Sequence, residues 1–112
     1  MARELEKTEW HPFLDRVSKV LSGKPAEIEV ASARLGDQIE AEWVPLIGIT
    51  YDPKNDIVDV AVQGLDHMIR KPQKLFVEED AGLVTSLEVI DAEGARQIVK
   101  LKNPLMLAAP EG

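Results

Sequence analysis

Histidine is the only side chain whose unperturbed pKa lies near neutrality, and His67 directly follows a carboxylate, Asp66. A carboxylate that orients an imidazole is the arrangement of a general base. However, no nucleophile or second ligand is spaced to join this pair, and adjacent residues often point apart. We therefore expect an ordinary loop histidine, and we keep Asp66 and His67 as candidate ligand-binding residues.

Aromatic side chains supply much of the contact area in binding pockets, so Trp43 and Tyr51 are further candidate ligand-binding residues. Core packing is the more common use of such residues. Trp10 lies on the apolar face of a predicted helix, and Trp43 begins a strand that is apolar on both faces. We expect Trp10 and Trp43 to lie near each other and to pack the helix against the sheet.

Oxygen ligands for a hard cation are available in the acidic turn formed by Asp52, Asn55 and Asp56. This turn lacks the glycine and the distal glutamate of a calcium-binding hand loop, so we interpret it as a turn. The acidic run at 78–80 is interpreted as a solvated corner. The chain has no cysteine, which excludes thiolate chemistry. The sequence thus assigns no catalytic residue, no metal ligand and no cofactor.

One helix is predicted between Thr8 and Gly23, because the apolar residues there recur at helical spacing. We expect Thr8 to cap its start, with Glu9 complementing the helix dipole. Pro12 is tolerated best in the first turn, where its missing N–H has no partner. The apolar face consists of Trp10, Phe13, Leu14, Val17, Val20 and Leu21.

The remaining chain has the two-residue period of strands. We expect strands at 26–32, 38–51, 57–63, 86–90 and 97–101, with a recovery of the pattern at 75–77. The residues from Trp43 to Tyr51 are apolar at both parities, which predicts a strand buried on both faces. Turns are predicted at Leu35–Asp37, at 52–56 and at Gly94, and the last two should close hairpins.

These elements indicate an α+β fold in which an N-terminal helix precedes about six mostly antiparallel strands. The strands would form either a strongly bent sheet that carries the helix or a small, partly open barrel with the helix across its end. Both alternatives remain open from the sequence. No repeat or low-complexity linker interrupts residues 1–112, so we expect a single domain.

The chain carries a formal net charge of -7, which would repel a phosphate backbone. Its one basic cluster is small and consists of Arg70, Lys71 and Lys74. We therefore expect no nucleic-acid binding. No run approaches the length of a membrane span, and the first residues do not read as a signal peptide, so we expect a cytoplasmic protein that does not bind membranes.

Four segments together resemble a family of small bacterial proteins classified only as a domain of unknown function. These segments are 40–54, 64–69, 87–94 and 104–107. The resemblance implies a bacterial, stand-alone domain. It implies no activity, cofactor or catalytic residue.

Two functions are compatible with these observations. The first is a non-catalytic interaction or accessory domain, because no set of reactive residues converges. The second is a small-ligand-binding protein or enzyme with a site near Asp66, His67 and Trp43. We also expect a homodimer, because the apolar segments at 43–51 and 105–109 would otherwise leave a bare patch on an open sheet.

Overall fold

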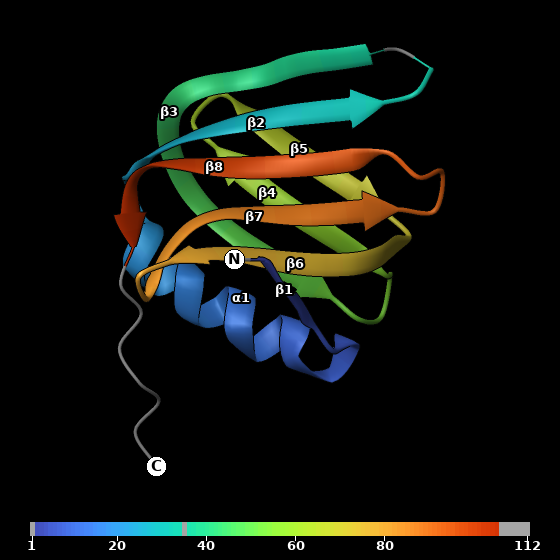
Figure 1. Ribbon diagram of the computed structural model, residues 1–112, viewed down its shortest axis with the longest axis horizontal. Helices are drawn as coiled ribbons and strands as arrows, with labels where there is room; N and C mark the ends of the chain where they lie inside the picture. The colour runs from blue at the N-terminus through green and yellow to red at the C-terminus, as the bar shows by residue number, and fades with distance from the viewer. Residues whose placement is uncertain (1, 35, 106–112) are drawn as a thin grey trace.

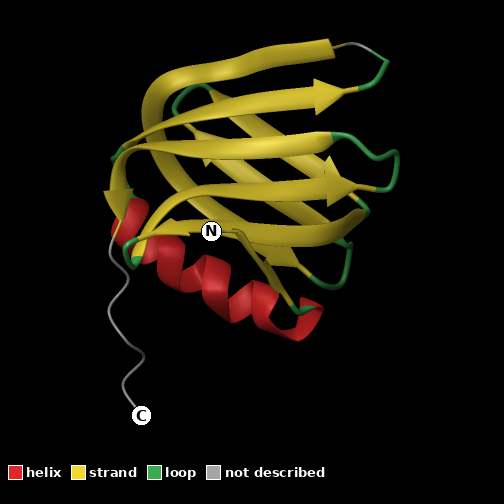
Figure 2. Ribbon diagram, viewed as in Figure 1, coloured by secondary structure: helices red, strands yellow, loops and turns green. Residues whose placement is uncertain are grey.

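The computed structural model describes residues 2–34 and 36–105 of the 112-residue chain. Within them, one helix, α1 (Lys7–Leu21), accompanies a sheet of eight antiparallel strands in the order β1-β6-β7-β8-β2-β3-β4-β5 (Figures 1 and 2). The strands are β1 (Ala2–Leu5), β2 (Pro25–Ser32), β3 (Gly36–Asp52), β4 (Ile57–Val62), β5 (Leu65–Arg70), β6 (Pro72–Asp80), β7 (Leu83–Asp91) and β8 (Arg96–Leu105).

The sheet folds over on itself because β3 belongs to two layers. Its first part pairs with β2 and its second part, from Leu46, pairs with β4. The bend falls near Trp43, whose φ of +50° lies in the left-handed region. Figure 1 shows β6, β7, β8 and β2 in front of β4 and β5. The end strands β1 and β5 do not pair with each other, so the sheet formed by the described residues is bent but not closed.

The prediction that β3 is buried on both faces is wrong. The pairing of β3 with β4 shifts register between Leu46 and Gly48, which adds one residue to β3. As a result Leu46 and Ile49 are both buried although they are three residues apart, while Ile47 is 62% exposed. A bulge, and not a second covered face, explains the apolar residues at both parities.

Helix α1 packs its apolar face into the open side of the folded sheet, as its periodicity predicts, except that Val20 is 40% exposed. Its start differs from the prediction. Glu6 is the N-cap residue, and its N–H donates to Glu9 Oε1 at 3.1 Å, so Thr8 is not the cap. Pro12 lies beyond the first turn, where it leaves the carbonyl of exposed Thr8 to water. The buried helix residues are Trp10, Phe13, Leu14, Val17 and Leu21.

The helix also covers the second edge of β3 along its β4-paired half. Ser18 Oγ donates to the carbonyl of Ile49 at 2.6 Å and accepts from the N–H of Ile49 at 2.8 Å. Just beyond the helix, Gly23 N–H donates to Leu46 O at 2.7 Å, and Leu46 N–H donates to Lys24 O at 2.9 Å. Backbone groups that a neighbouring strand would satisfy are thus bonded to α1 and the residues after it.

The predicted hairpins are confirmed. Residues 53–56 form the turn between β3 and β4, and Gly94, at φ +82°, lies in the turn between β7 and β8. The inner face of this last hairpin is buried, at Leu87, Val89, Val99 and Leu101. Leu35 and most of the segment 105–109 lie outside the described residues. Within the described chain, no helix has the length and apolar character that crossing a bilayer requires.

Candidate functional site

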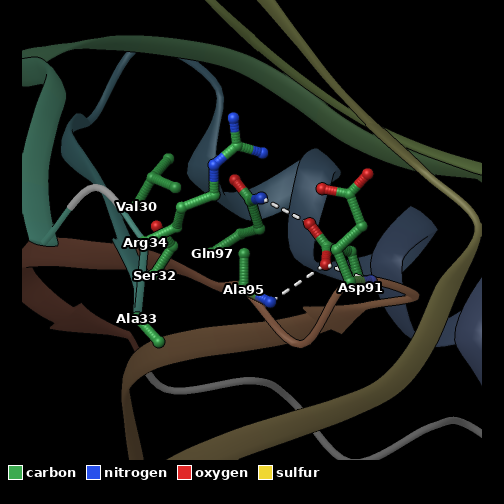
Figure 3. A pocket seen from close by; sticks show the side chains of 8 residues that line it. Val30, Ser32, Ala33, Arg34, Asp91, Ala95 and Gln97 are labelled. Carbon is green, nitrogen blue, oxygen red and sulfur yellow. Dashed lines mark hydrogen bonds between the residues drawn. The ribbon is translucent and has the colours of Figure 1, made fainter.

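Two hollows adjoin at the end of the folded sheet that carries the β2–β3 and β7–β8 turns. The first, shown in Figure 3, has a volume of about 490 Å³ and is lined by the end of β2, the turn after it and the β7–β8 turn. The second has a volume of about 390 Å³ and is lined by the end of β5 and the same β7–β8 turn. Asp91, Glu93 and Gln97 line both hollows, so these three residues form the wall between them.

A chain of hydrogen bonds runs through this wall and joins the two layers of the sheet. Gln97 Nε2 donates to Asp91 Oδ2 at 3.0 Å, which identifies Gln97 Oε1 as the acceptor end of the amide. That oxygen lies 2.7 Å from His67 Nε2, so the ring nitrogen must be the donor. His67 therefore keeps its other ring nitrogen, Nδ1, for a further partner.

Asp91 also holds the β7–β8 turn. Its Oδ1 accepts from the N–H of Glu93 at 2.9 Å and from the N–H of Ala95 at 3.0 Å. Gly94 N–H donates to the carbonyl of Asp91 at 3.0 Å. Hydrogen bonds within the β7–β8 turn therefore hold the shared wall of the two hollows in place. The role of Asp91 in these bonds is structural.

The walls carry both signs of charge. Arg34 lines the first hollow, Arg70 and Lys71 line the second, and Glu93 lines both. Such walls suit a polar or charged group. His67 is bonded through Nε2 to the side-chain amide of Gln97, and no hydroxyl group of the described residues is hydrogen-bonded to its ring.

The two adjacent candidates from the sequence, Asp66 and His67, lie on opposite faces of β5. His67 is opposite Val60, which is fully buried, and so shares the inner face, whereas Asp66 is opposite Ala61. Asp66 interacts there with Asp59 of β4. Burial, followed by the hydrogen bond and charge of Asp66, raises the pKa of Asp59 to about 6.

The aromatic candidates occupy two further places. Trp43 is 39% exposed at the bend of β3, so it does not pack beside buried Trp10 as expected. Tyr51 takes that position, with its ring edge-on to Trp10 at a centroid distance of 5.1 Å. Within the described chain His67 bonds to Gln97 and Tyr51 packs against Trp10, so these candidates do not form one site.

Tyr51 belongs to a cluster that ties the start of the helix to the β3–β4 turn. Its hydroxyl donates to Asp56 Oδ1 at 2.8 Å, and Lys7 Nζ lies 3.2 Å from the same oxygen. The hydrogen bond from Tyr51 and the nearby Lys7 lower the pKa of Asp56, while burial raises the pKa of Tyr51. Lys7 also lies over the ring of Trp10 at 5.3 Å. The cluster serves packing.

The acidic turn and the basic cluster are both solvent-facing. Asp52 accepts hydrogen bonds from the backbone N–H of Lys54 and from the side-chain amide of Asn55, as aspartate commonly does in turns. No group of carboxylates or histidines in the described part of the chain is arranged to hold a metal ion. Arg70, Lys71 and Lys74 are exposed.

Sequence reasoning missed Gln97 and Asp91. A usable signal existed for Gln97, because it shares the inward parity of Val99 and Leu101 and is the one buried polar residue of the described chain, at 8% exposure. A polar side chain at an inward position requires a buried hydrogen-bond partner. Which residue supplies that partner is set by the fold.

The first half of β3, residues 36–44, is a second candidate site, and we call it the open half of β3. It pairs with β2 on one side, and no strand among the described residues pairs with its other side. Residues 36–40 are all exposed, so both faces of this stretch meet solvent. In Figure 1 it forms the upper rim of the molecule.

Over residues 1–110 the chain matches the family described as "Family of unknown function (DUF5335)". A relative from Aquifex aeolicus (strain VF5), described as "Uncharacterized protein", is 37% identical over 106 residues, which cover 94% of this chain and 96% of the relative. No solved structure matches the chain. These matches confirm the resemblance inferred from the sequence, and the chain belongs to the family of unknown function DUF5335.

Proposed function

We propose that this protein is a non-catalytic interaction module that binds another protein through the open half of β3. The observation that supports this most strongly is that no described strand pairs with one edge of residues 36–44 and that 36–40 are exposed on both faces. Unpaired strand edges are templates for the addition of a further strand. Nine residues of strand extend over about 30 Å, which is enough for a peptide-length contact.

The other half of β3 has a covered edge, and this contrast supports the proposal. The half of β3 that pairs with β4 has its second edge covered by α1, through Ser18, and by the residues after the helix. The short edge strand β1 has four residues. The open half of β3 is longer, contains no proline and is left uncovered by the described residues. Bulges on either side of Ala41 and three acidic side chains discourage indiscriminate pairing at this edge, so it suits a selective docking site.

Exposed apolar side chains accompany the open half. Ile39 is 48% exposed and Trp43 is 39% exposed, and Ile47 follows just beyond the bend at 62%. A partner strand that pairs with this edge would place its own side chains beside these residues, and buried apolar area would add to the backbone hydrogen bonds.

A photo-crosslinking residue introduced at exposed Gln38 tests the proposal in the cells that produce the protein. We expect crosslinks to one protein or to a small, reproducible set. The matched control carries the same residue at Asp80, which is also exposed but lies on another strand. The proposal fails if position 38 yields no crosslinks or yields the same products as position 80.

A second candidate function is the binding of a small polar ligand at the two hollows. It is favoured by His67, whose Nδ1 remains available while Nε2 is bonded to Gln97, and by the mixed charges of the walls. A fragment titration followed by NMR tests this function. We expect the amide signals of Ala95 and Gln97 to move together and to stop responding in a Gln97→Leu variant. Unmoved signals across a diverse polar library contradict it.

The homodimer and the cytoplasmic location also stay proposals. Exposed Ile47, which lies outside the open half of β3, supports self-association through another surface, and the absence of cysteine from all 112 residues suits a reducing compartment.

A further inference from the structure

We propose that the open half of β3 receives a basic, extended segment of its partner, which adds to the sheet as a strand beside residues 36–44. This inference rests on the proposed function and gives the chemistry of the partner. Three observations support it. The edge is acidic, a second copy would bring like charges opposite each other, and exposed apolar side chains lie among the acidic ones.

The open half is acidic throughout. It contains Asp37, Glu40 and Glu42 and neither lysine nor arginine. Asp37 is partly neutralised from within the sheet, because its charge acts on Arg96 and Lys100 of β8. Glu40 and Glu42 are exposed and have no side-chain hydrogen bond or ion pair with the rest of the described chain. Their charges are therefore available to a partner.

A second copy of the chain is a poor occupant of this edge. Antiparallel pairing about a two-fold axis at residue 40 places Glu40 opposite its own copy. An axis at residue 41 places Glu40 opposite Glu42 twice. Like charges directly opposite each other destabilise a strand pair, whereas lysine or arginine at those positions stabilises it. The net charge of -7 adds a longer-range repulsion between copies.

The edge also selects for extended and partly apolar partners. Exposed Ile39 lies in register with Glu29 of β2, and Trp43 is exposed at the bend, so apolar side chains lie between the acidic ones. The pairing with β2 shifts register on either side of Ala41, so acidic and apolar side chains follow one another along this edge without strict alternation. A strand that carries both basic and apolar residues complements it.

Three synthetic nine-residue peptides test the inference, with valine alternating with lysine, threonine or glutamate. Binding to the full chain is measured by fluorescence anisotropy at about 50 mM salt, where screening is weak, and amide hydrogen exchange is read at residues 36–44. We expect the lysine peptide to bind about tenfold or more tightly than the threonine peptide and to protect the edge amides. The glutamate peptide should bind weakest.

Two controls separate strand addition from simple attraction. A lysine peptide with alternate amides N-methylated keeps its charge but loses backbone donors, and it should lose about tenfold or more in affinity. A Glu40→Lys/Glu42→Lys variant should lose a similar factor. The matched Glu4→Lys/Asp80→Lys variant changes exposed acids elsewhere, raises the net charge equally and should change affinity less than about twofold. Circular dichroism and melting curves verify that both variants fold.

Each outcome has a definite meaning. Equal binding of the N-methylated peptide, or equal loss in both charge variants, overturns strand addition at this edge. Preference for the threonine or glutamate peptide overturns the basic partner but leaves the interaction module standing. If no peptide protects residues 36–44 while position 38 still crosslinks in cells, the basic chemistry fails and the proposed function survives. If both experiments are negative, both proposals fail.

Discussion

Replacement of Asp59 by asparagine should stabilise the fold above neutral pH. Asp59 lies in β4 between two core residues, Val58 and Val60, and its Oδ1 atom is inaccessible to water and has no hydrogen-bond partner among the described residues. Burial, together with the hydrogen bond and charge of Asp66, raises the pKa of Asp59 from 3.8 to about 6. The ionised form is therefore the costly one, and asparagine of nearly the same shape cannot ionise.

The size of the effect follows from the shift in pKa. A shift of about 2 units corresponds to an upper limit of roughly 3 kcal/mol, at about 1.4 kcal/mol per unit. Asp59 is only partly buried, so solvent screening reduces this to about 1–2 kcal/mol. Because the folded-state pKa is raised, the wild-type fold binds the proton more tightly than the unfolded chain. The wild type loses stability as pH rises from about 4 through about 6, and the whole penalty is present above that window.

Urea unfolding monitored by tryptophan fluorescence provides the measurement, since Trp10 is buried in the core. We expect the free energy of unfolding of Asp59→Asn to match the wild type within a few tenths of a kcal/mol at pH 4 and to exceed it by about 1–2 kcal/mol at pH 8. Asp80→Asn, at an exposed position, is the control and should show little pH-dependent difference. A difference for Asp59→Asn that is constant with pH, or a loss of stability at pH 8, would refute the reasoning.

Three further predictions concern the covered edge, the assembly and nucleic acid. Ser18→Ala should lower the free energy of unfolding by about 1–3 kcal/mol, because it leaves the N–H and carbonyl of Ile49 without their partner, and denaturant unfolding measures this. Ser22→Ala, just beyond the helix, should change it far less. The homodimer should appear in light scattering and be weakened by Ile47→Lys; a monomeric wild-type mass at tens of micromolar contradicts it. Anisotropy with DNA or RNA at physiological salt should show no binding, and micromolar, salt-dependent affinity would overturn this.

The sequence by itself determined the features that depend on neighbours in the chain. Helical spacing from Trp10 to Leu21 predicted the buried face of α1, because a helix brings residues three and four apart to one side. The two-residue period predicted the strand at 57–63, and its alternate residues Val58, Val60 and Val62 are buried. The turn at 52–56 and the glycine at 94 predicted both hairpins, since turn chemistry acts over a few residues.

Edge strands were harder to identify. β1 and β5 were missed, so about six strands were expected where the described chain has eight. Each of the two pairs with a neighbour on one side only, and their exposed positions weaken the alternation of apolar and polar residues. The local pattern therefore carries little sign of a strand there.

Only the tertiary structure decided what residues distant in the chain do together. The bulge that turns Ile47 outward is a property of the pairing between β3 and β4, because an extra residue has meaning only against a partner strand. His67 meets Gln97 across 30 residues because the sheet folds its layers together. Whether the open half of β3 is covered depends on where α1 and the other strands pack. The residue pattern within 36–44 does not indicate whether another element covers this edge.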